Sequence, residues 1–312
     1  MENNFCGIMF VIMATVYTNQ SSNVAKTYLL MGLFLVVIVG LGYFISAYYG
    51  NPGLLYIAII FSVVMNIASF WWSDKIVLAM SKAKPAKREE YFDLYTVTEN
   101  LSITAGLPMP RVYVIDDPAP NAFATGRNKE HAVVCTTTGL LQKLDRQELE
   151  GVIAHELSHI GNRDILLMSA VVVLVGFVSI ISDMFLRASF FGGNRDNDRG
   201  SVGNVLAIIG IIFIVLSPII ATLIKMAISR RREYLADSSG VLLTRYPEGL
   251  AKALEKISSY NMPMKVASNA TAHLFISNPM PVKKNISGES ISNLFNTHPP
   301  IAERIKLLRE MI

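Results

Sequence analysis

The stretch that decides the fold is His155-Glu156-Leu157-Ser158-His159, near the middle of a chain of 312 residues. On an α-helix, residues four apart project from the same face, about one turn from each other. Two imidazoles at this spacing can bind one metal ion, and Glu156 between them can reach a water molecule beside it. The spacing therefore predicts a zinc site with His155 and His159 as ligands and Glu156 as general base. The alternative is a pair of ordinary surface histidines.

The residues in front of this motif predict where its helix begins. Asp145 followed three residues later by Glu148 is typical of a capping box at a helix N-terminus. We expect the helix to carry the motif and to continue directly into an apolar run at residues 165–182. Alternating and β-branched patterns predict short strands at 111–115, 121–125 and 131–137, and helical patterns occupy 87–105, 247–260 and 299–311.

The composition indicates a membrane protein. The chain is 52% hydrophobic and only 17% charged, whereas a soluble domain carries about 25% charged residues. A spanning helix needs about 20 apolar residues, and four runs of this kind lie at 27–49, 53–72, 165–182 and 202–224. A shorter run at 5–17 leads us to interpret residues 1–26 as an N-terminal extension at the membrane interface, with a fifth span as the alternative.

Basic residues predict how the spans are oriented, because Lys and Arg are enriched in cytoplasmic loops. One cluster follows the second apolar run and another follows the fourth: Lys75, Lys82, Lys84, Lys87 and Arg88, then Lys225, Arg230, Arg231 and Arg232. We therefore expect a multi-pass protein of the cell (plasma or inner) membrane whose polar stretches face the cytoplasm. The predicted order is a hairpin at 27–73, a first catalytic part at 74–164, a second hairpin with a short outside loop at 165–225, and a second catalytic part at 226–312.

A catalytic zinc site needs a third protein ligand. Glu233 and Asp237 share one face of a helix that we expect after the fourth apolar run. We predict that Glu233 is the third ligand and that Asp237 accepts a hydrogen bond from a ligand imidazole, which would fix its tautomer. A solvated helix with Arg–Glu pairs is the alternative for this stretch. The two cysteines, Cys6 and Cys135, fit no metal spacing and are expected to be unpaired thiols.

Six stretches resemble the HtpX family of membrane zinc proteases, which are relatives of the CaaX prenyl proteases. They are SDKIVLAM (73–80), PNAFATG (120–126), HELSHIGNRD (155–164), ISRRREYLAD (228–237), TAHLFISNP (271–279) and THPPIAERI (297–305). The resemblance implies that His155, His159 and Glu233 bind one Zn²⁺ and that Glu156 is the catalytic base. Together with the four apolar runs and the basic clusters, it predicts a mainly α integral membrane protein, with four transmembrane helices and a zincin-like cytoplasmic metalloprotease domain that contains a small β-sheet.

Further site residues are predicted around the zinc. His298, which stands before two prolines, is a candidate donor to the tetrahedral oxyanion, and the resemblance supports it. An incidental histidine in a helix-cap region is the alternative. Arg304 either helps to position the site or simply pairs with a carboxylate. The stretch Asn121, Ala122 and Phe123 is similar to a family position beside the substrate, where an extended edge can pair with a peptide. It can equally be a core strand with Phe123 buried.

These features predict a zinc metalloendopeptidase that hydrolyses membrane or misfolded proteins on the cytoplasmic side, in membrane protein quality control. The expected partners are protein substrates and the lipid bilayer. The sequence contains no basic stripe with interleaved aromatic residues, so it gives no indication of nucleic-acid binding. A CaaX-type processing protease and a non-enzymatic scaffold or chaperone-like binder are the alternatives. His131 and His273 lack a partner at ligand spacing, so we expect surface or helix-cap histidines there.

Overall fold

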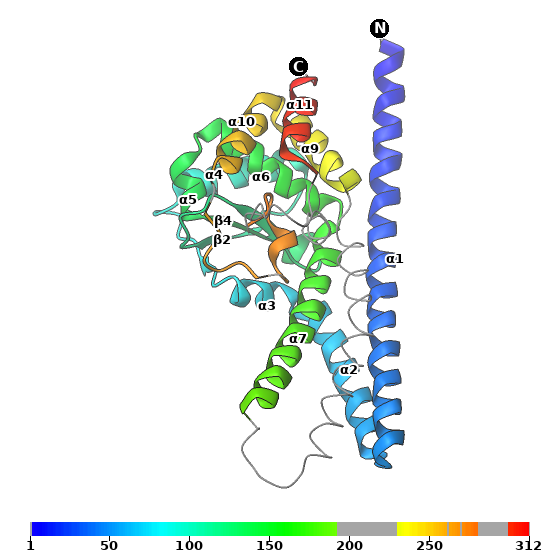
Figure 1. Ribbon diagram of the computed structural model, residues 1–312. Coiled ribbons are helices and arrows are strands. Elements are labelled where there is room, and N and C mark those ends of the chain that lie inside the picture. The colour runs from blue at the N-terminus through cyan, green and yellow to red at the C-terminus, as the bar shows by residue number, and fades with distance from the viewer. Residues whose placement is uncertain (1, 192–229, 261, 269, 280–298, 312) are drawn as a thin grey trace, which may run out of the picture.

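The computed structural model describes residues 2–191, 230–260, 262–268, 270–279 and 299–311, and the rest is drawn as a grey trace in Figure 1. Long helices occupy one part of the molecule, and a mixed domain of helices and a small sheet occupies the other (Figure 1). The predicted fourth apolar run at 202–224, most of the predicted outside loop and His298 lie outside the described residues.

Two apolar helices form a hairpin. They are α1 (Glu2–Tyr49) and α2 (Gly53–Trp71), and Gly50 turns the chain between them with a φ of +62°, where a residue without Cβ is favoured. Both are long and apolar enough to span a membrane, over Gln20–Tyr49 in α1 and Gly53–Trp71 in α2. With 48 residues, α1 is about 70 Å long and exceeds the bilayer core of about 30 Å. It has no break at residue 27, where the predicted N-terminal extension ends, and it continues past the mixed domain (Figure 1).

The helix of the HELSH motif does not continue into the third apolar run. The motif helix α6 (Arg146–Gly161) and the next helix α7 (Asp164–Phe191) differ in direction by 85°. Arg163 between them has a left-handed φ of 57°, which interrupts a right-handed helix. The prediction of one continuous helix is therefore wrong. Within the described residues two helices qualify as spans, or three if the bent pair counts as one, so the four predicted spans are not confirmed.

Side chains of α1 explain why α6 can end at this bend. The last carbonyl groups of a helix have no partner within it. Gln20 Nε2 donates to the carbonyl of Gly161 at 2.6 Å, and Asn23 Nδ2 donates to the carbonyl of Asn162 at 3.2 Å. At its other end, α6 begins with the predicted capping box between Asp145 and Glu148.

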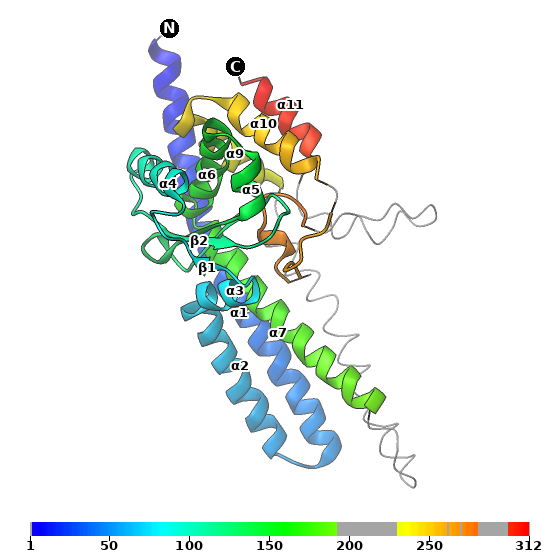
Figure 2. The ribbon, with the colours of Figure 1, turned by 90° about the vertical axis from the view of Figure 1, so that its left-hand side faces the viewer.

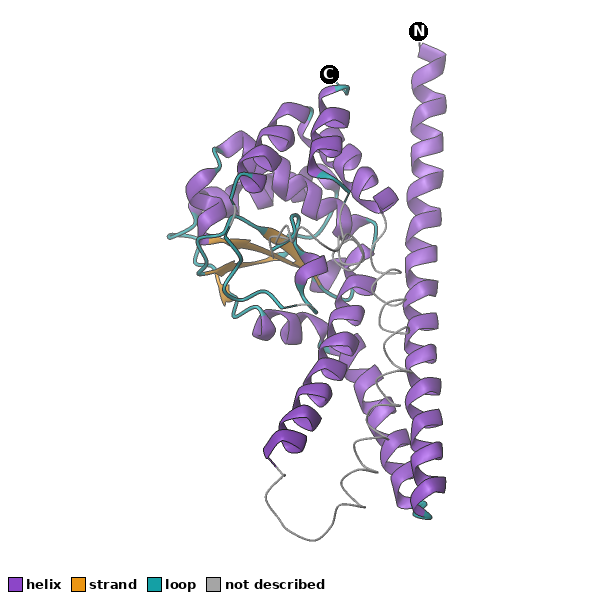
Figure 3. Ribbon diagram, in the orientation of Figure 1, coloured by secondary structure: helices purple, strands orange, loops and turns teal. Residues whose placement is uncertain are grey.

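The sheet of the mixed domain has four strands in the order β1-β2-β4-β3. Strand β2 pairs with β4 in parallel, and the other two pairs are antiparallel. The predicted strand at 111–115 is confirmed, and the one at 131–137 begins later because η1 (Lys129–His131) is a turn of 3₁₀-helix. The strands are drawn in orange in Figure 3. The strands are β1 (Lys84–Pro85), β2 (Arg111–Ile115), β3 (Ala122–Thr125) and β4 (Val133–Thr137).

Helices cover the sheet, with α6 on the side opposite to α3 (Figures 1 and 2). The helices of this domain are α3 (Ser73–Met80), α4 (Phe92–Ala105), α5 (Thr138–Lys143), α6, α9 (Arg230–Thr244), α10 (Pro247–Ser258) and α11 (Ile301–Arg309), with the short η2 (Ala272–Leu274). We call these elements and the sheet the αβ domain. Helix α6 lies at its centre and is buried almost throughout. Gly151 allows this, because a Cβ there would lie 2.6 Å from the backbone nitrogen of Leu250 on α10.

Candidate metal centre

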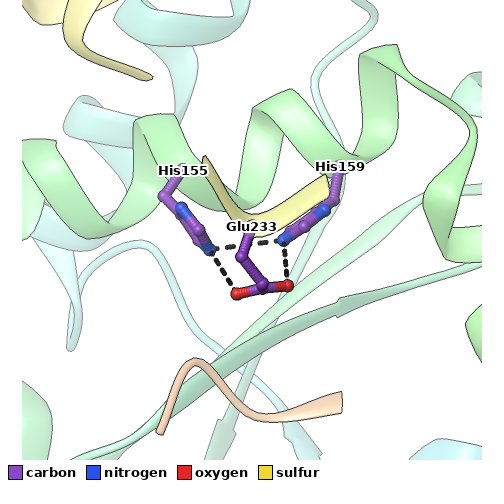
Figure 4. A group of neighbouring side chains, drawn as sticks. All are labelled: His155, His159 and Glu233. Carbon is purple, nitrogen blue, oxygen red and sulfur yellow. Dashed lines mark hydrogen bonds and ion pairs between the residues drawn. The ribbon is translucent and has the colours of Figure 1, made fainter. Parts of the chain in front are cut away.

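Two histidines and a glutamate converge in the αβ domain (Figure 4). His155 and His159 project from α6, and Glu233 comes from the first turn of α9. Their Nε2 atoms lie 3.2 Å apart, and the Glu233 oxygens lie 3.8 Å from His155 Nε2 and 3.6 Å from His159 Nε2. All three side chains are buried, and their possible ligand atoms lie within 4.8 Å of one another. The structure thus brings together the three residues predicted as ligands.

The outer ring nitrogens decide which atoms face Glu233. His155 Nδ1 lies 2.9 Å from Asp237 Oδ1, and His159 Nδ1 lies 2.9 Å from Asp164 Oδ2. An ionised carboxylate only accepts hydrogen bonds, so these neighbours favour the tautomer in which each Nδ1 carries the proton. With both rings neutral, the two Nε2 lone pairs face each other and the Glu233 carboxylate, an arrangement that a positive charge between them would stabilise. Two imidazoles and one carboxylate are a donor set that fits a divalent metal ion such as zinc.

The charges of the side chains favour a cation at this position. Burial disfavours a charged His159, but its hydrogen bond to Asp164 and the negative charges of Glu233 and Glu156 outweigh burial and raise its pKa to about 9. For His155, burial prevails over Asp237 and lowers the pKa. The site therefore attracts one positive charge, for which a proton and a metal ion compete.

Glu156 lies between the two histidines in sequence and is also buried. Burial raises its pKa to about 7, against the positive charge of His159 and a hydrogen bond from the backbone of Ala124 in β3. A carboxyl group with a pKa near neutrality can both take up and return a proton at physiological pH. Glu156 is thus next to the ligand histidines in sequence and is hydrogen-bonded to the edge strand β3, so it can exchange a proton with a molecule bound between them.

Arg304 on α11 binds Asp237, the carboxylate behind His155. Its Nε and Nη2 donate to the two oxygens of Asp237 at 2.8 and 2.7 Å, and its Nη1 donates to the carbonyl of Ile276 at 3.1 Å. Nη1 also lies 3.7 Å from Glu233 Oε2. Although burial opposes it, the charge of Arg304 holds the pKa of Asp237 at about 2. Both alternatives for Arg304 therefore apply: it pairs with a carboxylate, and that carboxylate contacts His155.

Three residues that were not assigned to the site from the sequence, Asp164, Asn23 and Arg232, lie behind His159 and contact one another. The second oxygen of Asp164 accepts a hydrogen bond from Asn23 Nδ2 at 2.6 Å. Arg232 Nη1 donates to Asn23 Oδ1 at 3.3 Å, and Arg232 Nε lies 3.7 Å from Asp164. A carboxylate shortly after the HELSH motif was a signal for Asp164. No signal in the sequence indicated Asn23, which belongs to the membrane helix α1.

Comparison with known proteins places this geometry in a family. Residues 89–312 match the family model described as peptidase family M48. The chain belongs to peptidase family M48. It is 47% identical over 302 residues to the "Protease HtpX homolog" of Caldanaerobacter subterraneus subsp. tengcongensis, covering 95% of this chain and 98% of the relative. Its identity to the protein of the same name from Thermoanaerobacter pseudethanolicus is 49% over 304 residues, with the same coverage.

Among solved structures, the crystal structure of S. mikatae Ste24p has 19% sequence identity and a TM-score of 0.48, and the match covers 95% of this chain and 67% of that one. The resemblance to the HtpX family is confirmed by the curated relatives. With its M48 domain and two apolar helices, the chain is a membrane metalloprotease.

In this M48 domain, β3 is the edge strand beside the metal centre. Asn121 and Phe123 face β4 and the core: the carbonyl of Asn121 accepts from Thr137, and Phe123 is fully buried with its ring 5.2 Å from that of Phe275. The side chain and the backbone groups of Phe123 therefore both face away from the open edge, because the register pairs Phe123 with Cys135 on β4. The backbone groups of Ala122 face the open edge, where the carbonyl accepts a hydrogen bond from Ile276 at 2.9 Å.

The Asn121 side chain is not free either. Its Nδ2 donates to the carbonyl of Ser277 at 2.9 Å, and its Oδ1 accepts from the backbone nitrogen of Ser277 at 3.3 Å. The amide thus fastens residues 276–277 to the edge of β3. In this structure the Asn121–Phe123 stretch contacts the chain itself, as in the predicted core-strand alternative.

The remaining histidines differ from each other. His131 is exposed, and its Nδ1 lies 2.7 Å from Asn128 Oδ1, as expected for a surface histidine. His273 is only 3% exposed, with Nε2 3.4 Å from the carbonyl of Met168 on α7. The prediction of a surface or cap histidine is wrong for His273, because the segment around η2 packs against α7. Cys135 is a free, buried thiol whose pKa is raised by burial.

Proposed function

We propose that this membrane metalloprotease is a zinc-dependent endopeptidase that cleaves membrane or misfolded proteins from the cytoplasmic side of the cell membrane. The observation that carries the proposal is the convergence of His155 Nε2, His159 Nε2 and Glu233 beside a buried glutamate and a sheet edge. Relatives that match almost the whole chain are named as proteases.

His155, His159 and Glu233 would hold the zinc ion. When bound, zinc supplies a Lewis acid that polarises a peptide carbonyl and acidifies a water molecule. Asp237 and Asp164 keep the ligand imidazoles in the tautomer that presents Nε2. Within the described residues the cluster offers three ligands, whereas a structural zinc site is normally closed by four. This supports the enzyme over the scaffold.

Glu156 is the proposed general base. It would take a proton from water at its carboxylate and return it to the leaving amine, for which its pKa of about 7 is well suited. His298 is the proposed second donor to the oxyanion, on the strength of its sequence context alone. Arg304 and Asp237 act on the site through His155 and are positioning residues.

The substrate is proposed to lie extended along the edge of β3. Ala122 and Ala124 have small side chains, so a peptide backbone can approach closely, and a hydrogen bond already joins the Ala124 backbone to Glu156. Pairing at Ala122 would displace its contact with Ile276. A segment that adds to a strand edge must be extended, and unfolding exposes such segments, which supports misfolded or partly unfolded proteins as substrates.

The cytoplasmic orientation is proposed from the basic residues on the αβ domain side of α2. Lys75, Lys82 and Lys84 follow the end of this helix directly, and such clusters remain in the cytoplasm. The αβ domain lies at this end of α2, away from the α1–α2 turn (Figure 2). Site and basic cluster are thus proposed to share the cytoplasmic side.

Cleavage of an unfolded protein such as casein by the zinc-loaded full chain in detergent tests this function. Glu156→Gln should retain zinc and lose nearly all activity, whereas Glu233→Ala should lose zinc as well. Glu150→Gln on the same helix is the matched control, because Glu150 pairs with the partly exposed Arg146, and it should stay active. Full activity of Glu156→Gln, or of Glu233→Ala with unchanged zinc content, would contradict the assignment.

A further inference from the structure

A second cavity, away from the metal centre, lies where α2 meets the αβ domain. Its volume is about 500 Å³, within the range of ligand pockets, about 300–1,000 Å³. One wall comes from the end of α2, and the other comes from α3, β2 and the chain around η1. The residues that matter here are Ile67, Trp71 and Trp72 on the first wall and Lys75, Arg111 and Arg127 on the second.

The second wall is positively charged. Its three cations stand against one carboxylate of the lining, Asp74, which pairs with Arg111. The charges of Lys75 and Arg127 are therefore not balanced by an acidic residue in the cavity. Arg127 is held in place, because its guanidinium lies 4.5 Å above the ring of Trp71 and donates to His131 Nε2 at 2.8 Å. The cavity favours an anion.

The first wall lies at the end of a candidate membrane span. Trp71 is the last residue of α2 and Trp72 follows it, and tryptophan is enriched at the level of lipid headgroups. The two indoles are 53% and 49% exposed, and Ile67, one turn deeper in α2, is 46% exposed. A ligand in this cavity thus meets cations on one side and exposed apolar surface on the other.

We propose that this cavity binds the headgroup of an anionic phospholipid, with the phosphate on Lys75 and Arg127 and the acyl chains along Ile67 and Trp71. A free phosphate ion shares the anionic chemistry but would leave the apolar wall uncovered. Basic residues near the membrane surface attract anionic lipids. The bound lipid would tie α3, β2 and η1 to the bilayer and orient the αβ domain. The proposal goes beyond proteolysis and does not depend on the metal site.

Tryptophan fluorescence tests it directly, because the only two tryptophans of the chain both line the cavity. The full chain in a neutral detergent is titrated with short-chain phosphatidylglycerol and with phosphatidylcholine of equal chain length. We expect phosphatidylglycerol to saturate the signal at a concentration about tenfold lower. The double variant Lys75→Gln/Arg127→Gln should lose this difference. The control Arg146→Gln/Lys306→Gln removes the same charge from other exposed positions and should keep it.

Saturation by both lipids at the same concentration would overturn the proposal. It would also be overturned if the double variant melted at the wild-type temperature and still bound phosphatidylglycerol more tightly than phosphatidylcholine. If that variant does not fold, Lys75→Gln alone decides the question, because Lys75 is exposed; it should weaken phosphatidylglycerol binding several-fold, and an unchanged titration counts against the site. Inorganic phosphate is the third arm. The same saturating change with phosphate alone would identify a free anion as the occupant and overturn the lipid proposal, whereas no response supports it.

Discussion

Arg304 on α11 and Asp237 on α9 form a buried ion pair with two parallel hydrogen bonds of 2.8 and 2.7 Å. The same Asp237 oxygen that accepts from Arg304 Nη2 lies 2.9 Å from Nδ1 of His155. The C-terminal helix therefore orients a carboxylate, and the carboxylate orients a ligand histidine. Paired Arg–carboxylate geometry of this kind restricts direction as well as distance, so the position of His155 depends on the docking of α11.

Arg304→Ala should destabilise the protein and weaken its metal binding. The change leaves Asp237 buried without its partner, which costs about 3–5 kcal/mol, and a disturbed outer contact lowers metal affinity about 10–100-fold. Thermal melting and zinc titration measure the two effects. Arg304→Lys keeps the charge but cannot make the two parallel hydrogen bonds. Its melting temperature and zinc affinity should lie between those of the wild type and Arg304→Ala. A wild-type melting temperature and zinc affinity in Arg304→Ala would refute the positioning role.

Asn23→Ala should lower zinc affinity about tenfold, although Asn23 lies on a membrane helix. The variant removes the hydrogen bond to Asp164, which holds His159, and the acceptor for Arg232. Thr27→Ala is the matched control one turn further along α1, because the Thr27 hydroxyl donates within the same helix, to the carbonyl of Asn23. Competition with a chromophoric chelator gives both affinities. Equal zinc affinities of the two variants would show that the hydrogen bond from Asn23 to Asp164 does not support His159.

Gly151→Ala should destabilise the αβ domain by about 1–3 kcal/mol. The added methyl would meet the backbone of Leu250 at 2.6 and 2.8 Å, and backbone atoms cannot rotate away as a side chain can. Helices α6 and α10 must then separate. Gly161→Ala at the other end of α6 has 3.9 Å to its nearest neighbour, the side chain of Leu107, and should be nearly neutral. Melting curves of both variants decide, and equal melting temperatures would contradict the packing account.

Zinc binding should weaken as the pH falls. The pKa of His159 is raised to about 9, so below that pH the ion must displace a proton. One displaced proton lowers the apparent affinity about tenfold per pH unit. The affinity is measured at pH 6, 7 and 8 by chelator competition, corrected for the titration of the chelator itself. An affinity that does not change over this range would show that His159 is already neutral.

The parts of the site that were predictable are those that short-range rules describe. The positions of His155 and His159 follow from a spacing of four on one helix face, and the start of α6 follows from the Asp145–Glu148 capping box. Glu233 was expected as an acidic residue on a separate helix, and the structure places it beside both histidines. Asp237 was expected to contact a ligand imidazole, and it lies beside His155.

The errors have one physical origin. A straight passage from α6 into α7 was expected from their continuous helical pattern, but α1 supplies hydrogen bonds to the carbonyls of Gly161 and Asn162 and permits an 85° bend. His273 was expected to be a surface or helix-cap histidine because it lacks a partner at ligand spacing, and packing of the η2 segment against α7 buries it. Each error lies where a distant segment contacts the residue concerned.

The sequence by itself determined the motif helix, the strand at 111–115, the apolar runs that form α2 and the second half of α1, and the chemistry of the metal ligands, because spacing along a helix and apolar runs are local properties. The tertiary structure alone decided that Asp164 and Asn23 lie behind His159 and that Arg304 holds Asp237. Asn23 and Asp164 are 141 positions apart, and Asp237 and Arg304 are 67 apart. Such contacts form only when the helices pack, since no short-range rule relates residues so distant along the chain.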